Sequence, residues 1–125
     1  MPLRIKHLIF AVTLAAAPSV TFAHDVAKGA HGGQVVDDKG HHVELTTEGN
    51  DLVVYLTDEK DQPIDSSRVS GRIMIAGRNA PAALVPGVPN VLAGKLDVPL
   101  VTGSKIVVKA KLADGHDIQA RFVIK

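Results

Sequence analysis

The chain has 125 residues, with 14 Lys and Arg against 13 Asp and Glu, six histidines and no cysteine. This length suits one domain with a modest core. Without cysteine, the chain can form neither a disulfide nor a thiolate metal site or nucleophile. Charge is nearly balanced and no basic cluster is interleaved with aromatic residues, which argues against a nucleic-acid partner.

The first 23 residues have the pattern of a secretory signal peptide. Arg4 and Lys6 give it a positive start, an apolar run covers residues 8–17, and small residues occupy the −3 and −1 positions before a cut after Ala23. The apolar run is shorter than the roughly 20 residues that a membrane-spanning helix needs. A cut after Ala17 is disfavoured because a proline would follow it. We therefore predict a periplasmic protein with no membrane anchor after cleavage.

Cleavage after Ala23 changes the chain in two ways. It removes two basic residues and no acidic one, so the mature chain is slightly acidic. It also makes His24 the first residue, and the α-amine and imidazole of an N-terminal histidine can chelate one metal ion together. Residues 24–33 are small, polar and rich in glycine, and we expect them to form a flexible N-terminal arm.

Beyond the arm, short apolar runs alternate with turn signals, which is typical of an all-β domain. The pattern predicts strands at 35–36, 42–47, 51–58, 69–75, 82–85, 91–96, 106–112 and 118–124. We expect 42–47 to form a hairpin with 51–58, and 106–112 to form another with 118–124. For residues 34–125 this favours an immunoglobulin-like sandwich of about seven short antiparallel strands. A small open barrel is the alternative.

Enzymatic signatures are missing from the sequence. It has no glycine-rich phosphate loop, no HExxH motif and no serine in a nucleophile elbow. Its acidic residues fall mostly in turns. We therefore predict no catalytic residues, no organic cofactor and no enzymatic activity.

The histidines are the residues that indicate a candidate functional site, namely a metal site. His41 and His42 are adjacent at the start of a predicted strand, where neighbours point to opposite faces, so they cannot easily bind one ion together. His42 and Glu44 are two residues apart, as are Asp114 and His116, so each pair can project toward a common ion. Imidazole, amine and carboxylate donors suit Cu(II), Zn(II) or Ni(II) better than Cu(I). The candidate metal ligands are His24, His31, His42, Glu44, Asp114 and His116.

Most of the mature chain resembles a bacterial pattern that can be written HGG…HHxEL…YLxD…xPI. Here the pattern is carried by His31-Gly32-Gly33, His41-His42-Val43-Glu44-Leu45, Tyr55-Leu56-Thr57-Asp58 and Pro63-Ile64. In carrying this pattern, the chain resembles small exported bacterial proteins and the periplasmic head region of adaptor subunits from heavy-metal efflux pumps. The resemblance implies a periplasmic β-sandwich linked to metal traffic, with an efflux-pump component or another periplasmic protein as partner.

A second, local resemblance lies at the end of the chain. Residues 113–116 (ADGH), followed by 120–124 (ARFVI), resemble the C-terminal hairpin of CopC-type periplasmic copper proteins. Those proteins begin their mature chain with histidine and bind Cu(II) through it and a D-x-H pair, which implies His24, Asp114 and His116 as ligands here. The second histidine that closely follows the first in the CopC pattern is missing from this chain.

Two functions follow from the sequence. The first is a periplasmic metal-binding or metal-handling protein, chiefly for Cu(II), with a link to heavy-metal efflux or resistance. The second is a non-catalytic periplasmic interaction module whose histidines are incidental. In the second case His31, His42 and His116 are solvated arm, strand-edge and turn residues, and Glu44 is a charge on the sheet surface.

Overall fold

The computed structural model describes residues 27–125. The predicted signal peptide, its cleavage site and His24 lie outside the described residues. Within 27–125 there is no helix with the length and apolar character needed to cross a membrane.

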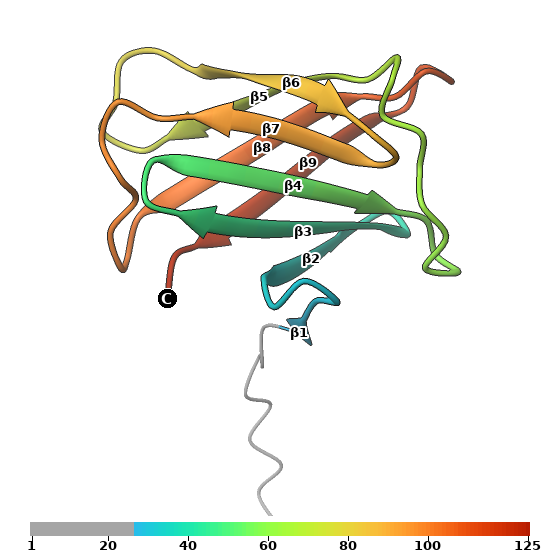
Figure 1. The fold of residues 1–125 in the computed structure, drawn as a ribbon, viewed down its shortest axis with the longest axis horizontal. Helices are drawn as coiled ribbons and strands as arrows, with labels where there is room; N and C mark the ends of the chain where they lie inside the picture. Colours follow the sequence, from blue (N-terminus) through green and yellow to red (C-terminus); the bar gives the residue numbers. More distant parts are fainter. Residues whose placement is uncertain (1–26) are drawn as a thin grey trace, which may run out of the picture.

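Residues 27–125 fold entirely into strands, turns and loops, which confirms the predicted all-β class (Figure 1). The strands are β1 (Ala27–Lys28), β2 (Gln34–Asp38), β3 (His41–Glu48), β4 (Asp51–Thr57), β5 (Ser70–Ile75), β6 (Ala82–Gly87), β7 (Val91–Lys95), β8 (Lys105–Lys111) and β9 (Asp117–Val123). Each predicted strand has a counterpart among β2 to β9. Both expected hairpins are present, as β3 with β4 and β8 with β9.

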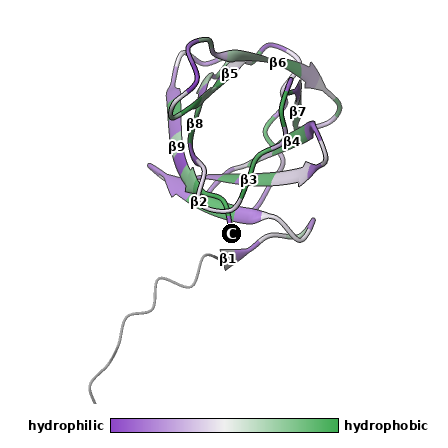
Figure 2. Cartoon of the chain, turned by 90° about the vertical axis from the view of Figure 1, so that its left-hand side faces the viewer, coloured by the Kyte–Doolittle hydropathy of each residue, from purple (hydrophilic) through white to green (hydrophobic). Residues whose placement is uncertain are grey.

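All the strands belong to one antiparallel sheet, in the order β1-β2-β3-β4-β7-β6-β5-β8-β9. The sheet curls around the core, so β3, β4 and β7 form a layer that faces β8 and β9, and the end-on view shows the strands as a ring (Figure 2). The curl brings β2 beside β9, where Gln34 Nε2 donates to the Val123 carbonyl at 3.1 Å. Nearby, the Gln119 amide donates to Asp38 Oδ2 at 2.9 Å. The sheet is therefore nearly closed, with a sandwich-like core between its two layers.

The core is aliphatic and follows the alternation of the strands. On β8, Ile106, Val108 and Ala110 are buried, and on β9 the buried residues are Ile118, Ala120 and Phe122. These are the positions expected to face inward, since successive side chains on a strand point to opposite sides. Thr47 near the end of β3 departs from this pattern, because it is exposed although Val43 and Leu45 on the same face are buried.

The described part of the predicted N-terminal arm is hydrogen-bonded to the sheet. Ala27 and Lys28 pair with β2, and the chain then turns with the Gly29 amide donating to the Gly33 carbonyl at 2.9 Å. The hydrogen bonds place residues 29–33 over the side of β3 that faces away from the core.

Candidate histidine and carboxylate site

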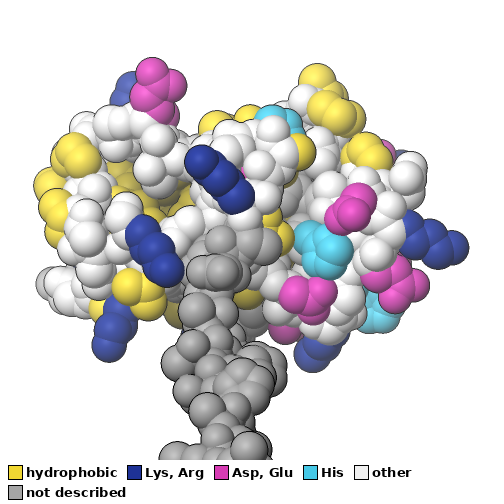
Figure 3. Space-filling view, turned by 90° about the horizontal axis from the view of Figure 1, so that it is seen from below, with side chains coloured by type: hydrophobic (Ala, Val, Ile, Leu, Met, Phe, Trp, Pro, Cys, Tyr) yellow, Lys and Arg dark blue, Asp and Glu magenta, His cyan; other side chains and the backbone are white. Residues whose placement is uncertain are grey.

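Histidine side chains lie among acidic side chains on one part of the surface (Figure 3). His41 and His42 come from the start of β3 and His116 from the β8–β9 turn, while the loop between β4 and β5 contributes the acidic residue Asp61. The sections of chain that carry them are far apart in sequence. The curl of the sheet brings the β2–β3 turn and the β8–β9 turn to the same end of the molecule.

Asp114 and His116 form an exposed pair in the β8–β9 turn, as their spacing predicts. The Asp114 carboxylate accepts from the His116 backbone amide at 2.9 Å, and His116 Nδ1 lies 2.8 Å from Asp114 Oδ2. The hydrogen bond from the His116 backbone amide, followed by that from its side chain, lowers the pKa of Asp114 below the usual value. Gly115, with φ of 90°, lets the turn fold back so that both contacts form.

His41 is the imidazole that lies beside this pair. Its ring centroid is 6.1 Å from that of His116, with the ring planes inclined by 50°. Its Nδ1 lies 3.3 Å from the Asp38 carbonyl. The Asp38 side chain in turn accepts from the backbone of Gln119, so one residue links the two hairpins that carry His41 and His116. His41 was not among the predicted ligands, because its position next to His116 depends on closure of the sheet.

His42 points to the other side of β3 and lies between two carboxylates. Its Nε2 is 3.1 Å from Asp37 Oδ2, and its Nδ1 is 2.8 Å from Asp61 Oδ1. Asp37 stands opposite His42 in the β2–β3 register, whereas Asp61 comes from the loop after β4. Both ring nitrogens are thus occupied, and in this arrangement His42 has no nitrogen left for a metal ion.

Glu44 lies on the same side of β3 as His42 but has different partners. Its carboxylate accepts from the backbone amides of His31 at 3.0 Å and Gly33 at 2.9 Å, and His31 Nδ1 is 2.9 Å away. The His31 ring stacks on Tyr55 with centroids 3.6 Å apart and planes at 5°. Glu44 is only 6% exposed, and it serves to hold the loop against the sheet. The structure therefore does not bring His42 and Glu44 toward a common ion.

One feature is shared by His31, His41 and His116. In each, Nδ1 lies within hydrogen-bond distance of an oxygen, from Glu44, Asp38 and Asp114 respectively. A neutral imidazole that donates from Nδ1 presents the lone pair of Nε2, which is how metal-binding histidines are commonly oriented. Within residues 27–125, no group of three or more His, Asp or Glu side chains is already arranged around an ion. A complete set of metal ligands is therefore not preassembled in that part of the chain.

Neither a protein-family model nor a curated protein matches the sequence. Among solved structures, the fold is similar to the archaellum periplasmic stator protein FlaG from Sulfolobus acidocaldarius, with 18% identity and a TM-score of 0.44. The match covers 62% of this chain and 92% of that one. A similarity of this size says nothing about function.

Proposed function

We propose that this chain is a periplasmic metal-handling protein that binds Cu(II) at the β2–β3 and β8–β9 turns. The observation that carries the proposal is the placement of His41 and His116 with their rings 6.1 Å apart and the Asp114 carboxylate on Nδ1 of His116. Zn(II) and Ni(II) accept the same nitrogen and oxygen donors. The resemblance to efflux-pump adaptor heads supports a role in metal traffic.

The separation of the two rings is compatible with one shared ion. With a metal–nitrogen distance of about 2.1 Å, each ring centroid lies roughly 3.2 Å from the ion, so two rings on one ion are at most about 6.4 Å apart. The observed 6.1 Å is inside that limit. This separation is long for ligands at a right angle, so binding would draw the half-buried His41 and the exposed His116 together by side-chain rotation.

The proposed ligands have separate roles. His116 and His41 bind through Nε2, and Asp114 holds the His116 ring in place, which is the usual arrangement around a metal-binding histidine. The amine and imidazole of His24 complete a set of nitrogen donors suited to Cu(II). His24 belongs to the proposal through the predicted cleavage after Ala23 and lies outside the described residues.

Calorimetric titration of the mature protein with Cu(II) tests this proposal. We expect equimolar binding, weakened at least tenfold by His116→Ala or His41→Ala. His42→Gln is the matched control and should change the affinity little, because both nitrogens of His42 are already occupied by Asp37 and Asp61. A single glycine added before His24 should weaken binding by at least an order of magnitude. Equal binding by all these variants would contradict the proposal.

The competing function is a non-catalytic interaction module. It is favoured by the contacts of His31 and His42, which serve the internal stability of the fold through Glu44, Asp37 and Asp61. Weak Cu(II) binding that no histidine substitution alters would support this second function.

A further inference from the structure

The outer side of β5, β8 and β9 is positively charged, in contrast to the acidic surroundings of the histidine and carboxylate site. It holds Arg72 on β5, Lys105, Lys109 and Lys111 on β8, and Arg121 on β9. We call these residues the basic face. They alternate with buried core residues, so they point away from the core. Asp117 is the one acidic residue in these three strands.

On this face Lys111 stands opposite the Asp117 carboxylate in the β8–β9 register, whereas the other basic residues have no acidic residue opposite them. Arg72 and Lys109 stand directly opposite each other in the β5–β8 register. Like charges at opposed positions destabilise a sheet. Between described residues, the ion pair that involves a Lys or Arg is Lys95 with Asp51, on another part of the sheet. Arg72 and Lys109 are thus adjacent like charges without an ion-pair partner among the described residues, and together they can attract an anionic group.

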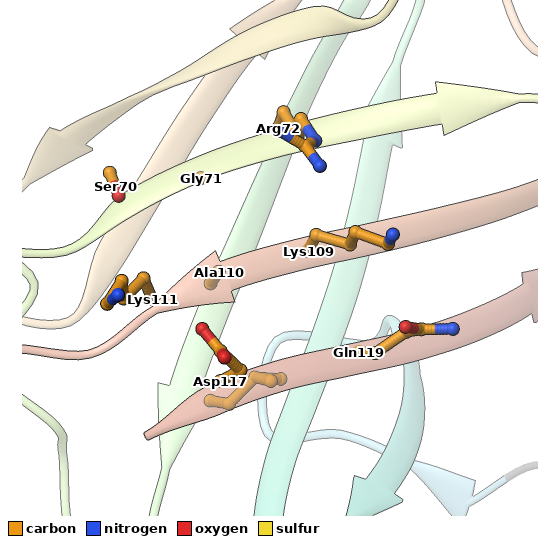
Figure 4. A pocket seen from close by; sticks show the side chains of 9 residues that line it. Ser70, Gly71, Arg72, Lys109, Ala110, Lys111, Asp117 and Gln119 are labelled. Carbon is orange, nitrogen blue, oxygen red and sulfur yellow. The ribbon is translucent and has the colours of Figure 1, made fainter. Parts of the chain in front are cut away.

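Three residues of the basic face, Arg72, Lys109 and Lys111, line a shallow hollow on the outside of the sheet (Figure 4). The hollow is lined by Ser70, Arg72, Lys109, Lys111, Asp117 and Gln119, among others. In Figure 4 the side chains of Arg72 and Lys109 lie side by side on neighbouring strands. From Lys105 to Lys111 the charges extend over about 20 Å, at roughly 3.3 Å per residue along a strand. Such a spread suits an array of anionic groups better than one small anion.

Exposed apolar side chains adjoin the positive charges. Val123 is 51% exposed and stands opposite Lys105 on the outer side of β9. Val101 is 67% exposed and lies in the loop before β8. This loop is held beside the end of β9, because the Gly103 amide donates to the Ile124 carbonyl. Basic side chains mixed with exposed apolar ones are typical of surfaces that rest on a lipid headgroup layer. β5 and β8 are paired on both sides, so a partner cannot extend the sheet there.

We propose that the basic face binds the surface of a membrane containing anionic phospholipids. The lysines and arginines contact the phosphate groups, and Val101 and Val123 enter the interface. The contact is peripheral and reversible, and salt weakens it because exposed charges are screened. The inference is independent of metal binding, since it uses none of the histidines.

Sedimentation with vesicles tests this inference on the mature protein. One set of vesicles is pure phosphatidylcholine, and the other contains about one third phosphatidylglycerol. We expect binding to the anionic vesicles only. Arg72→Gln with Lys109→Gln should weaken it at least tenfold, while the thermal midpoint holds or rises because the repulsion is relieved. Val101→Ser with Val123→Ser should also weaken it.

The matched control neutralises the same amount of charge elsewhere. Lys28→Gln with Lys60→Gln alters exposed lysines outside the basic face and should leave vesicle binding within about twofold. If both double variants lost vesicle binding equally, binding would depend on net charge alone and not on the basic face, which would overturn the inference. Failure of the unaltered protein to bind anionic vesicles would also overturn it. So would binding to soluble polyglutamate without vesicle binding, because the partner would then be an acidic protein.

Discussion

The Glu44 side chain lies on the opposite face of β3 from the core residues Val43 and Leu45, yet it is only 6% exposed. A buried carboxylate is costly unless donors surround it. Here the backbone amides of His31 and Gly33 and the His31 ring supply those donors, and a carboxylate can only accept. Glu44 thus fixes the N-terminal loop to the outside of the sheet and orients His31 on Tyr55.

Replacing Glu44 with glutamine should show how strongly stability depends on the hydrogen bonds that Glu44 accepts from the N-terminal loop. The amide keeps the size of the side chain but has one acceptor oxygen in place of the two that now serve the His31 and Gly33 amides and the His31 ring. We expect the free energy of unfolding to fall by about 1–3 kcal/mol, the cost of an unsatisfied buried polar group. Urea denaturation measures it, and amide exchange at His31 and Gly33 should speed up. Glu48→Gln, on an exposed position of the same strand, is the control, and equal effects of the two substitutions would contradict this role for Glu44.

Asp58 should contribute to the pH dependence of stability. Its Oδ1 accepts from the backbone amides of Gln62 at 2.9 Å and Lys60 at 2.8 Å. The bond from Gln62, before that from Lys60, lowers the pKa of Asp58 below the usual 3.8. A carboxyl whose pKa is lower in the folded state adds stability above its unfolded pKa, and this stability is lost as the pH falls through the folded value.

The urea midpoint measured between about pH 5 and about pH 2.5 tests this expectation. Asp58→Asn cannot titrate, so its midpoint should fall less on acidification than that of the unaltered protein. The two proteins should therefore differ most near pH 5 and converge in acid. Parallel curves would show that the hydrogen bonds to Asp58 do not couple its protonation to folding.

At the scale of the elements, the β2–β3 hairpin and the loop before it pack too closely for a side chain at Gly33. A Cβ built there would clash with the Leu45 carbonyl oxygen, which belongs to the backbone and cannot rotate away. We expect Gly33→Ala to lower the free energy of unfolding by about 1–3 kcal/mol, as overpacking usually does. Ala30→Ser, at an exposed position of the same loop, is the control for denaturant titration. Unchanged stability in Gly33→Ala would show that the loop is not held against β3.

The period-two patterns were enough to predict β3, β4, β8 and β9, because in these strands alternate side chains enter the core. The strand β1 could not be predicted. It has only two residues, and its existence depends on pairing with β2. The same holds for the burial of Glu44, since an acidic residue on the outer side of a strand normally faces water.

Long-range contacts limited the prediction of the candidate site. The Asp114–His116 pair is local, so its spacing in the sequence was informative. His41 beside His116 and Asp61 beside His42 follow from the curl of the sheet and the path of a loop. No periodicity within a strand carries that information.

At the scale of the whole molecule, closure of the sheet links stability to the proposed metal site. Few direct bonds join β2 to β9, and one of them runs from the Gln119 amide to Asp38 Oδ2. The backbone carbonyl oxygen of Asp38 also lies 3.3 Å from His41 Nδ1. The turn that carries His41 is thus tied to the hairpin that carries His116 by a residue that is not itself a proposed ligand.

Asp38→Ala should therefore have two effects. Loss of an acceptor for the Gln119 amide should lower the free energy of unfolding by about 1 kcal/mol. Release of the two turns should also weaken Cu(II) binding, because His41 and His116 would no longer be held near each other. Asp38→Asn keeps a carbonyl acceptor for Gln119 and should restore much of both properties. Denaturation and calorimetric titration of the two variants measure the effects together. Weaker folding with unchanged Cu(II) affinity would separate closure of the sheet from the metal site and place the ligands elsewhere in the chain.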